Sequence, residues 1–237
     1  MSFERIDRAA TSAEVRRREI LVAALRVIAA GGPDAITHRR VAAEARVPLG
    51  SLTYYFDSRE DLVREAFRHY MAATGAFLDA LGHEIPATTP AALVKMLVEM
   101  ARREFVDPAM VRAEYEMILY AARDPEIWRE FTAWERGLEA RLAANFEGLG
   151  VARPVDAART TINLVRGFEI EKLARPTDIA DDLRRRLTIV IDALTRPHPS
   201  RAPHRQSAIS GRAETSARLP RREPKKSGTA KTRRTLG

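Results

Sequence analysis

The sequence predicts an all-α protein of about nine helices, and three observations support this prediction. Apolar residues recur at spacings of three and four almost everywhere before residue 196, which is the period of an amphipathic helix. Stretches of alternating β-branched residues, which would indicate strands, are absent from the sequence. Asp-Pro and Arg-Pro pairs separate the periodic stretches, where a proline can only open a new element.

Capping residues indicate where the first helices begin. Thr11 and Glu14 have the spacing of a capping box. Thr37 and Ser58 are favourable N-cap residues, and Pro48 suits the first turn of a short helix. The predicted helices cover about 11–30, a short stretch from 37, 48–55, a long helix from 58 that ends before 82, 91–105, 109–122, 125–148, 155–174 and 179–195.

Glycine and proline indicate where these helices end. Gly31 and Gly32 stop the first helix, and the chain breaks again over 82–90. Asp124 and Asp178 are natural N-caps for the helices that follow them. The later boundaries are the pairs Asp107–Pro108, Asp124–Pro125, Arg153–Pro154 and Arg175–Pro176.

The composition excludes several classes of function. The chain has no cysteine, which excludes disulfides, thiolate metal sites, Fe–S clusters and cysteine nucleophiles. No Ser/His/Asp set, phosphate loop or dinucleotide fingerprint is present, so we expect neither an enzyme nor a cofactor. His69 and His83 lack a nearby third ligand, so no metal site is expected. No apolar run approaches the roughly 18 residues of a membrane span, and the N-terminus does not read as a secretory signal. A cytoplasmic protein is expected.

The net charge of +8 resides in the C-terminal segment. From Arg196 onward there are 12 basic and 2 acidic residues, whereas the rest of the chain carries 28 and 30. This segment has few large apolar residues, so residues 197–237 are predicted to be a disordered basic tail. Two interpretations stay open: a flexible arm that contacts DNA phosphates, or a solubilising extension.

Two short helices joined by a tight turn and followed by a long helix form a helix-turn-helix arrangement. Here the segment ITHRRVAAEARVPLGSLTYYFDSREDL resembles the DNA-binding region of the TetR family of bacterial regulators. Departures from the family pattern are Arg46 in place of glycine, Pro48 in place of serine, Thr53 in place of tyrosine and Arg59 in place of lysine. The matching positions are Thr37, Val41, Ala42, Ala45, Val47, Gly50, Leu52, Tyr55, Phe56 and Leu62.

The resemblance implies a domain organisation. It consists of a flexible N-terminus at 1–12, a helix-turn-helix DNA-binding domain at 13–82, a helical effector-binding and dimerisation domain at 83–196, and the tail at 197–237. The strong motif covers about residues 14–75, and the helices beyond it resemble the family only in number, length and layout.

The expected DNA contacts lie on the outward face of the third helix, at the start of the second and at the start of the fourth. Small, hydroxyl and aromatic side chains suit phosphate hydrogen bonds, thymine-methyl contacts and close backbone approach. Alternatively, Tyr54 and Tyr55 form the aromatic lid of a small core, and residues 16–18 are a solvated face. The candidates are Thr37, His38, Arg39, Leu49, Gly50, Ser51, Thr53, Tyr54, Tyr55 and Arg59.

The C-terminal helices supply candidates for a dimer interface and an effector pocket. A terminal pair of helices that is apolar on several sides is often buried by a partner, which predicts a homodimer through Gly167, Ile170, Leu187, Val190, Ile191 and Leu194. Alternatively, Gly167 only relieves packing within the chain. Methionine and aromatic residues in the middle helices predict an apolar pocket lined by Met96, Met100, Glu114, Met117, Tyr120, Trp128 and Phe131, although each alone suits a plain core.

The leading functional hypothesis is a sequence-specific DNA-binding transcriptional regulator. The resemblance implies a repressor that a small apolar effector releases from a palindromic operator on double-stranded DNA. The alternative is a ligand-independent architectural DNA-binding protein that uses its basic tail.

Overall fold

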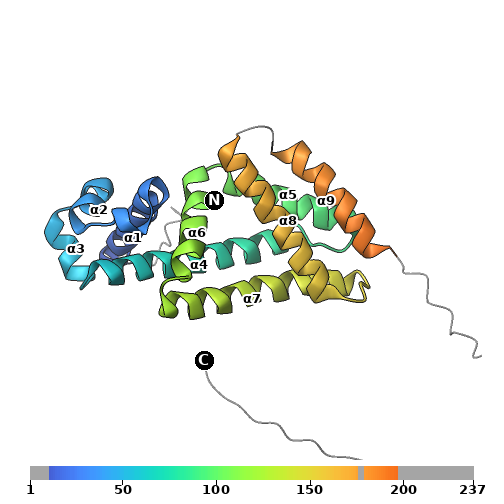
Figure 1. Ribbon diagram of the computed structural model, residues 1–237, viewed down its shortest axis with the longest axis horizontal. Helices are drawn as coiled ribbons and strands as arrows, with labels where there is room; N and C mark the ends of the chain where they lie inside the picture. The colour runs from blue at the N-terminus through green and yellow to red at the C-terminus, as the bar shows by residue number, and fades with distance from the viewer. Residues whose placement is uncertain (1–10, 176–178, 197–237) are drawn as a thin grey trace, which may run out of the picture. The chain divides into compact units, whose positions relative to one another are not determined.

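The computed structural model describes residues 11–175 and 179–196, and over these ranges it contains nine α-helices, one 3-10 turn and no strand (Figure 1). The predicted all-α fold is therefore confirmed. The elements are α1 (Ser12–Gly31), η1 (Pro33–Ala35), α2 (His38–Ala45), α3 (Leu49–Tyr55), α4 (Arg59–Glu84), α5 (Pro90–Glu104), α6 (Pro108–Ala121), α7 (Pro125–Gly148), α8 (Pro154–Ala174) and α9 (Ala180–Thr195).

The predicted helix ends agree closely with the observed ones, with one exception. Helix α4 continues through Gly82 to Glu84, so the break predicted from residue 82 begins at Ile85. The buried Leu81 anchors this last turn, and its carbonyl accepts a hydrogen bond from the Ile85 N–H at 2.8 Å. The predicted cap at Asp178, most of the N-terminal segment 1–12 and the tail lie outside the described residues.

The predicted caps at Thr11, Thr37, Ser58 and Asp124 are present. The Thr11 hydroxyl oxygen accepts from the Glu14 N–H, and the Glu14 carboxylate accepts from the Thr11 N–H at 2.7 Å, which completes the capping box. Thr37 and Ser58 each accept a hydrogen bond from the backbone N–H three residues later, at 3.1 and 3.0 Å. Local sequence thus sets the starts of α1, α2 and α4.

Two apolar cores lie in the described part of the chain. The first joins α1–α4 to α6 and the start of α7, and includes Phe56, Phe67, Met117 and Phe131. Because α6 packs on α1, this core crosses the expected domain boundary at residue 82. The second core joins α5, the end of α7, α8 and α9 around Phe146 and other buried side chains. None of the described helices combines the length and hydropathy that crossing a membrane requires.

Helix α4 connects the regions of the two cores. Figure 1 shows it running from helices α1–α3 to the region of α5, α7 and α8, and it packs on α1 at one end and on α5 and α7 along its length. A change in the packing around the C-terminal half of α4 can therefore shift the helix-turn-helix, because the same helix contacts both regions.

The turn between α2 and α3 has a strained residue. Arg46 has φ 55° and ψ 43°, and it is the one non-glycine residue with positive φ in the described ranges. A β-carbon makes this left-handed conformation costly, by roughly 1–2 kcal/mol. The conformation closes the turn, since the Val47 N–H donates to the Ala42 carbonyl at 3.0 Å.

We expect Arg46→Gly to raise the free energy of unfolding by about 0.5–1 kcal/mol, because the relief of left-handed strain exceeds the added entropy of the unfolded chain. Urea unfolding followed by circular dichroism measures the change. Ala43→Gly, in the preceding turn of α2, is the matched control and should lower stability by about 1 kcal/mol. If Arg46→Gly lowers the free energy of unfolding, the left-handed conformation of Arg46 does not destabilise the folded protein.

Candidate nucleic-acid interface and ligand cavity

Helix α3 presents large apolar side chains to solvent. Tyr54 is 81% exposed and Leu49 is 50% exposed, while Leu52 and Phe56 on the opposite side are buried in the first core. An aromatic ring and a branched alkyl group held outward by a packed helix suit contacts with phosphates and thymine methyl groups. The predicted recognition helix thus has the expected inward and outward faces.

At Gly50 of α3, another molecule could approach the helix backbone closely. A β-carbon at Gly50 would have nothing within 4 Å, so the space above this glycine is open. The Thr53 hydroxyl donates to the Gly50 carbonyl at 3.1 Å, and Ser51 is half-buried. Of the two candidate hydroxyl groups on α3, that of Thr53 therefore already donates its hydrogen bond within the helix.

The two adjacent tyrosines of α3 have different roles. Tyr55 is half-buried and packs against the first core, whereas Tyr54 projects outward. Their ring centroids are 4.9 Å apart in an edge-on arrangement. The aromatic-lid interpretation therefore fits Tyr55, and Tyr54 keeps the geometry of a surface contact.

The start of α2 brings three further candidates to the surface. Thr37 and Arg39 are exposed, and His38 is half-buried with a ring nitrogen, Nε2, that has no hydrogen-bond partner among the described residues. The Thr37 oxygen accepts the capping bond, which leaves its O–H free to donate to a phosphate. The positive end of the helix favours an anion at the same place.

Arg59 holds the connection between α1 and α2. Its guanidinium donates to the carbonyls of Pro33 and Ile36, at 3.0 and 3.2 Å, and pairs with Asp34 at 2.9 Å. A phosphate contact by Arg59 stays a prediction, because in this structure the donors of the guanidinium are engaged within the chain. Its observed effect is to fix the approach to α2.

An ionic network links α1, α4 and α7. Arg17 pairs with Glu65, and Arg68 binds Glu65, Glu126 and Glu130. Neighbouring carboxylates raise the pKa of Arg68 well above its usual value. The Arg17 side chain is 41% exposed, as the solvated-face interpretation of residues 16–18 expects, but its guanidinium also lies over a buried phenylalanine ring of the first core.

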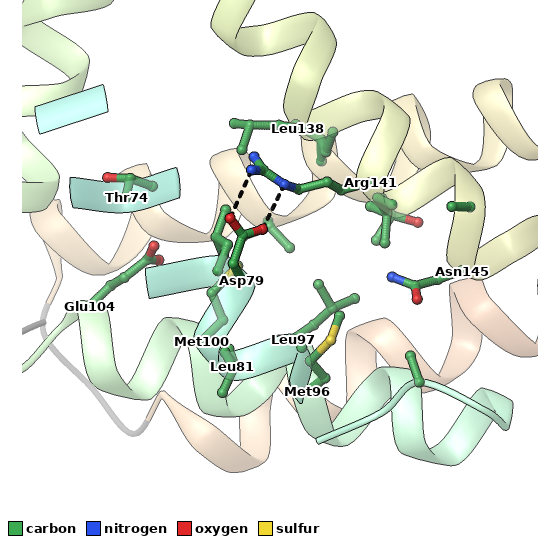
Figure 2. Close-up of a pocket in the computed structure, with 18 of the residues that line it drawn as sticks. Thr74, Asp79, Leu81, Met96, Leu97, Met100, Glu104, Leu138, Arg141 and Asn145 are labelled. Carbon is green, nitrogen blue, oxygen red and sulfur yellow. Dashed lines mark hydrogen bonds and ion pairs between the residues drawn. The ribbon is translucent and has the colours of Figure 1, made fainter. Parts of the chain in front are cut away.

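A cavity of about 460 Å³ lies between α4, α5, α6, α7 and α8. Figure 2 shows Arg141 and Asp79 joined above Leu81, Met96, Leu97 and Met100, with ion-pair distances of 3.1 and 3.2 Å. This volume suits a drug-sized molecule. Much of the wall is apolar, from Leu78, Met96, Leu97, Met100, Leu138 and Leu142.

Three of the seven predicted pocket residues line this cavity, namely Met96, Met100 and Glu114. The other four do not, because α6 and the start of α7 pack against the first core. Met117 and Phe131 are buried in that core and Tyr120 packs against it, whereas Trp128 is 54% exposed.

Most of the polar groups in the wall were not predicted from the sequence. Glu104 of α5 and Glu169 of α8 join Glu114 of α6 there. Burial and the negative charge of Glu114 raise the pKa of Glu169 to about 8, and burial raises the pKa of Glu104 well above its usual range. The position of Glu169 in the apolar stretch of α8 was a usable signal; nothing in the sequence distinguishes Glu104.

The predicted dimer residues divide into three groups by burial. Leu187 and Ile191 are fully buried in the second core as α9 packs on α5, so they do not face a partner. Gly167 and Ile170 are exposed on α8, and a β-carbon at Gly167 would meet nothing within 4 Å. Packing within the chain therefore does not require this glycine. Val190 and Leu194 are half-buried, and the neighbouring Ile189, which the sequence analysis missed, is 71% exposed.

A helix-turn-helix connected by one long helix to a helical domain with a cavity defines the class of DNA-binding regulators that carry a ligand domain in the same chain. Two family descriptions match the sequence: "Bacterial regulatory proteins, tetR family" over residues 20–66 and "Tetracyclin repressor-like, C-terminal domain" over residues 88–197. The chain belongs to the TetR family of transcriptional regulators, which are not enzymes.

Relatives agree with this assignment. The HTH-type transcriptional regulator BetI of Rhizobium meliloti (strain 1021) is 30% identical over 145 residues, which is 61% of this chain and 69% of the relative. A TetR-family structure from Streptomyces coelicolor A3 is 30% identical, with 74% of this chain and 97% of that chain covered at a TM-score of 0.58. The multidrug binding protein EbrR complexed with proflavin is 31% identical, with 76% and 99% covered at a TM-score of 0.51.

Proposed function

We propose that this protein is a homodimeric repressor that binds a palindromic operator through α3 and is released when a small molecule occupies the cavity. The main observation behind the proposal is that α4 belongs both to the first core and to the cavity wall. Its first half packs on α1 in the first core, and its second half, from Thr74 to His83, contributes to the cavity wall.

The mechanism follows from this shared helix. Filling the cavity favours those positions of α4 that leave room for the ligand, which is a population shift between two arrangements. The Arg17–Glu65 pair connects α4 to α1, so α1 and the recognition helix move with it. Two recognition helices must lie about 34–36 Å apart to enter successive major grooves, so a small rotation of α4 weakens operator binding.

The dimer in this proposal uses the exposed faces of α8 and α9. Ile170 is 54% exposed on α8 and Ile189 is exposed on α9, and Gly167 allows a second helix to approach closely. These side chains would be covered in a twofold pair. The structure of the relative EbrR contains proflavin, which supports the proposal that this protein also binds a small molecule.

Selection of DNA from a random pool by the full-length protein tests the operator proposal. We expect a palindromic motif with two half-sites. Tyr54→Ala and Thr37→Ala should weaken binding to all sequences by about 1 kcal/mol, because phosphate contacts carry little sequence information. Ser51→Ala and Leu49→Ala should instead change the preferred half-site, because these residues face base edges in the proposed complex.

Lys95→Ala is the control for these variants, because it lies on the exposed side of α5, away from α2 and α3. It should leave both the affinity and the motif unchanged. A selection that returns no motif, with binding governed by salt alone, would favour the alternative of an architectural DNA-binding protein.

A further inference from the structure

Three carboxyl groups gather in the cavity wall without a cation of their own. Glu104, Glu114 and Glu169 come from α5, α6 and α8, and none of them forms an ion pair with a described residue. Two are held by tyrosines: Tyr70 donates to Glu114, and Tyr115 donates to Glu169 at 2.7 Å. Burying a carboxylate is costly unless a cation lies beside it, and hydrogen bonds from tyrosines offset only part of that cost, so this arrangement needs an explanation.

The cations in the same wall have carboxylate partners of their own, although Nη2 of Arg166 is buried without a hydrogen-bond partner among the described residues. Arg166, on α8, pairs with Glu135 of α7, and Arg141 pairs with Asp79. The charge of Arg166 lowers the pKa of Glu114 and Glu169, but burial prevails and both pKa values are raised. The wall therefore has more carboxyl groups than it has cations to balance them.

A second observation places an unsatisfied polar group beside these carboxyls. Thr74, in the same wall, is 3% exposed, and its hydroxyl oxygen has no hydrogen-bond partner among the described residues. Figure 2 shows Thr74 and Glu104 at one end of the view and Asn145 at the other. Trp134 adds an aromatic ring to the wall, and it lies edge-on to Tyr70 with centroids 6.4 Å apart.

We infer that the cavity binds an organic cation with an apolar body, whose positive charge lies against Glu104, Glu114 and Glu169. The inference rests on the proposed function, since it takes the cavity as the effector site. The leucine and methionine walls accommodate the apolar body, and carboxylates with an aromatic ring provide the attraction for the charge. No group of three or more acidic or histidine side chains in the described ranges has the arrangement of a metal site, which favours an organic cation over an inorganic one.

Binding of such a cation is coupled to proton release. Burial raises the pKa of all three carboxyls, and the negative charge of Glu114 adds to the rise at Glu104 and Glu169. Tyr70, Tyr115, Glu135 and Arg166 are the other titratable groups that act on them. A cation favours the ionised form, so it lowers these pKa values and expels protons. Affinity for a permanent cation therefore rises with pH through the range in which these carboxyls lose their protons, which for Glu169 is centred on a pKa of about 8.

Fluorescence titration of the full-length protein with a matched pair of dyes tests the inference without DNA. The dyes are 10-methylacridinium, a permanent cation, and acridine, which has the same ring system and is neutral at pH 7.5. We expect the cation to bind at least tenfold more tightly, with a dissociation constant that falls between pH 6 and pH 8. Glu104→Gln should weaken cation binding at least tenfold and change acridine binding less than twofold.

Glu147→Gln is the matched control, because this carboxylate on α7 is exposed and lies outside the cavity wall. It should change neither titration. Equal binding of the two dyes by the parent protein, or unchanged cation binding in a folded Glu104→Gln protein, would overturn the inference. If Glu104→Gln does not fold, Glu114→Gln replaces it. Operator selection is measured without ligand, so a failed cation test leaves the proposed DNA-binding function intact.

Discussion

Phe56→Ala should lower the free energy of unfolding by about 3–5 kcal/mol and abolish operator binding. Phe56 is 1% exposed and forms the C-cap of α3, where its N–H donates to the Leu52 carbonyl at 2.8 Å. Its ring lies beneath α3 in the first core, and the Arg17 guanidinium covers it at 5.5 Å from the ring centroid. Truncation leaves a cavity under the recognition helix and removes this cation–π contact.

Tyr54→Ala separates loss of fold from loss of contact, because the same type of truncation is made on the exposed face of the same helix. We expect the free energy of unfolding to stay within about 0.5 kcal/mol of the parent value while operator affinity falls. Urea unfolding and a gel-shift titration measure the two quantities. If Phe56→Ala proves as stable as Tyr54→Ala, the first core does not hold α3 in place.

The helix-turn-helix could be predicted from the sequence because its signals are local. Thr37 and Ser58 cap their helices within one turn, and Val47, Leu52 and Phe56 all lie in the first core as their spacing indicates. Even the left-handed conformation of the turn follows from the position of Arg46 in the motif. Each of these features depends on residues a few positions apart.

The cavity depends on packing between distant segments, and the sequence analysis was correspondingly weaker there. Met100 and Met117 are similar residues on amphipathic helices, yet one lines the cavity and the other lies in the first core. Met100 lies on α5, which packs on α9, whereas Met117 lies on α6, which packs on α1, and no local pattern encodes these helix pairings. Glu104 is another case, because it is one of many glutamates until the folded chain brings α8 against it.

The dimer surface illustrates a different limit. Helix α9 needs one apolar face to pack on α5, and Leu187 and Ile191 supply it. A second apolar face would serve a partner, and Ile189 is the large apolar residue that stays exposed on this helix. The sequence of a helix that is apolar on several sides does not show which side is buried by its own chain.

The buried carboxyls should also make the stability of the protein fall as pH rises. The pKa of Glu169 is raised from 4.5 to about 8 in the folded protein, first by burial and then by the charge of Glu114. Between these two values the folded state holds a proton that the unfolded state has lost. Stability therefore decreases through this window, by up to about 1.4 kcal/mol per pH unit for one carboxyl. Glu104 and Glu114, whose pKa values are also raised, act in the same direction.

Urea unfolding at intervals from pH 5 to pH 8, without ligand, measures this slope. Glu169→Gln should flatten it, because an amide has no proton to lose, while the exposed Glu147→Gln should keep the slope of the parent. Carboxylates with lowered pKa, such as Glu99 at about 2 beside Arg102 and Arg103, change the stability only below about pH 4.5 and so do not mask the effect. A parent protein whose stability is constant or rises from pH 5 to pH 8 would mean that these carboxyls are ionised in the folded state, with cations or water reaching them in the empty cavity.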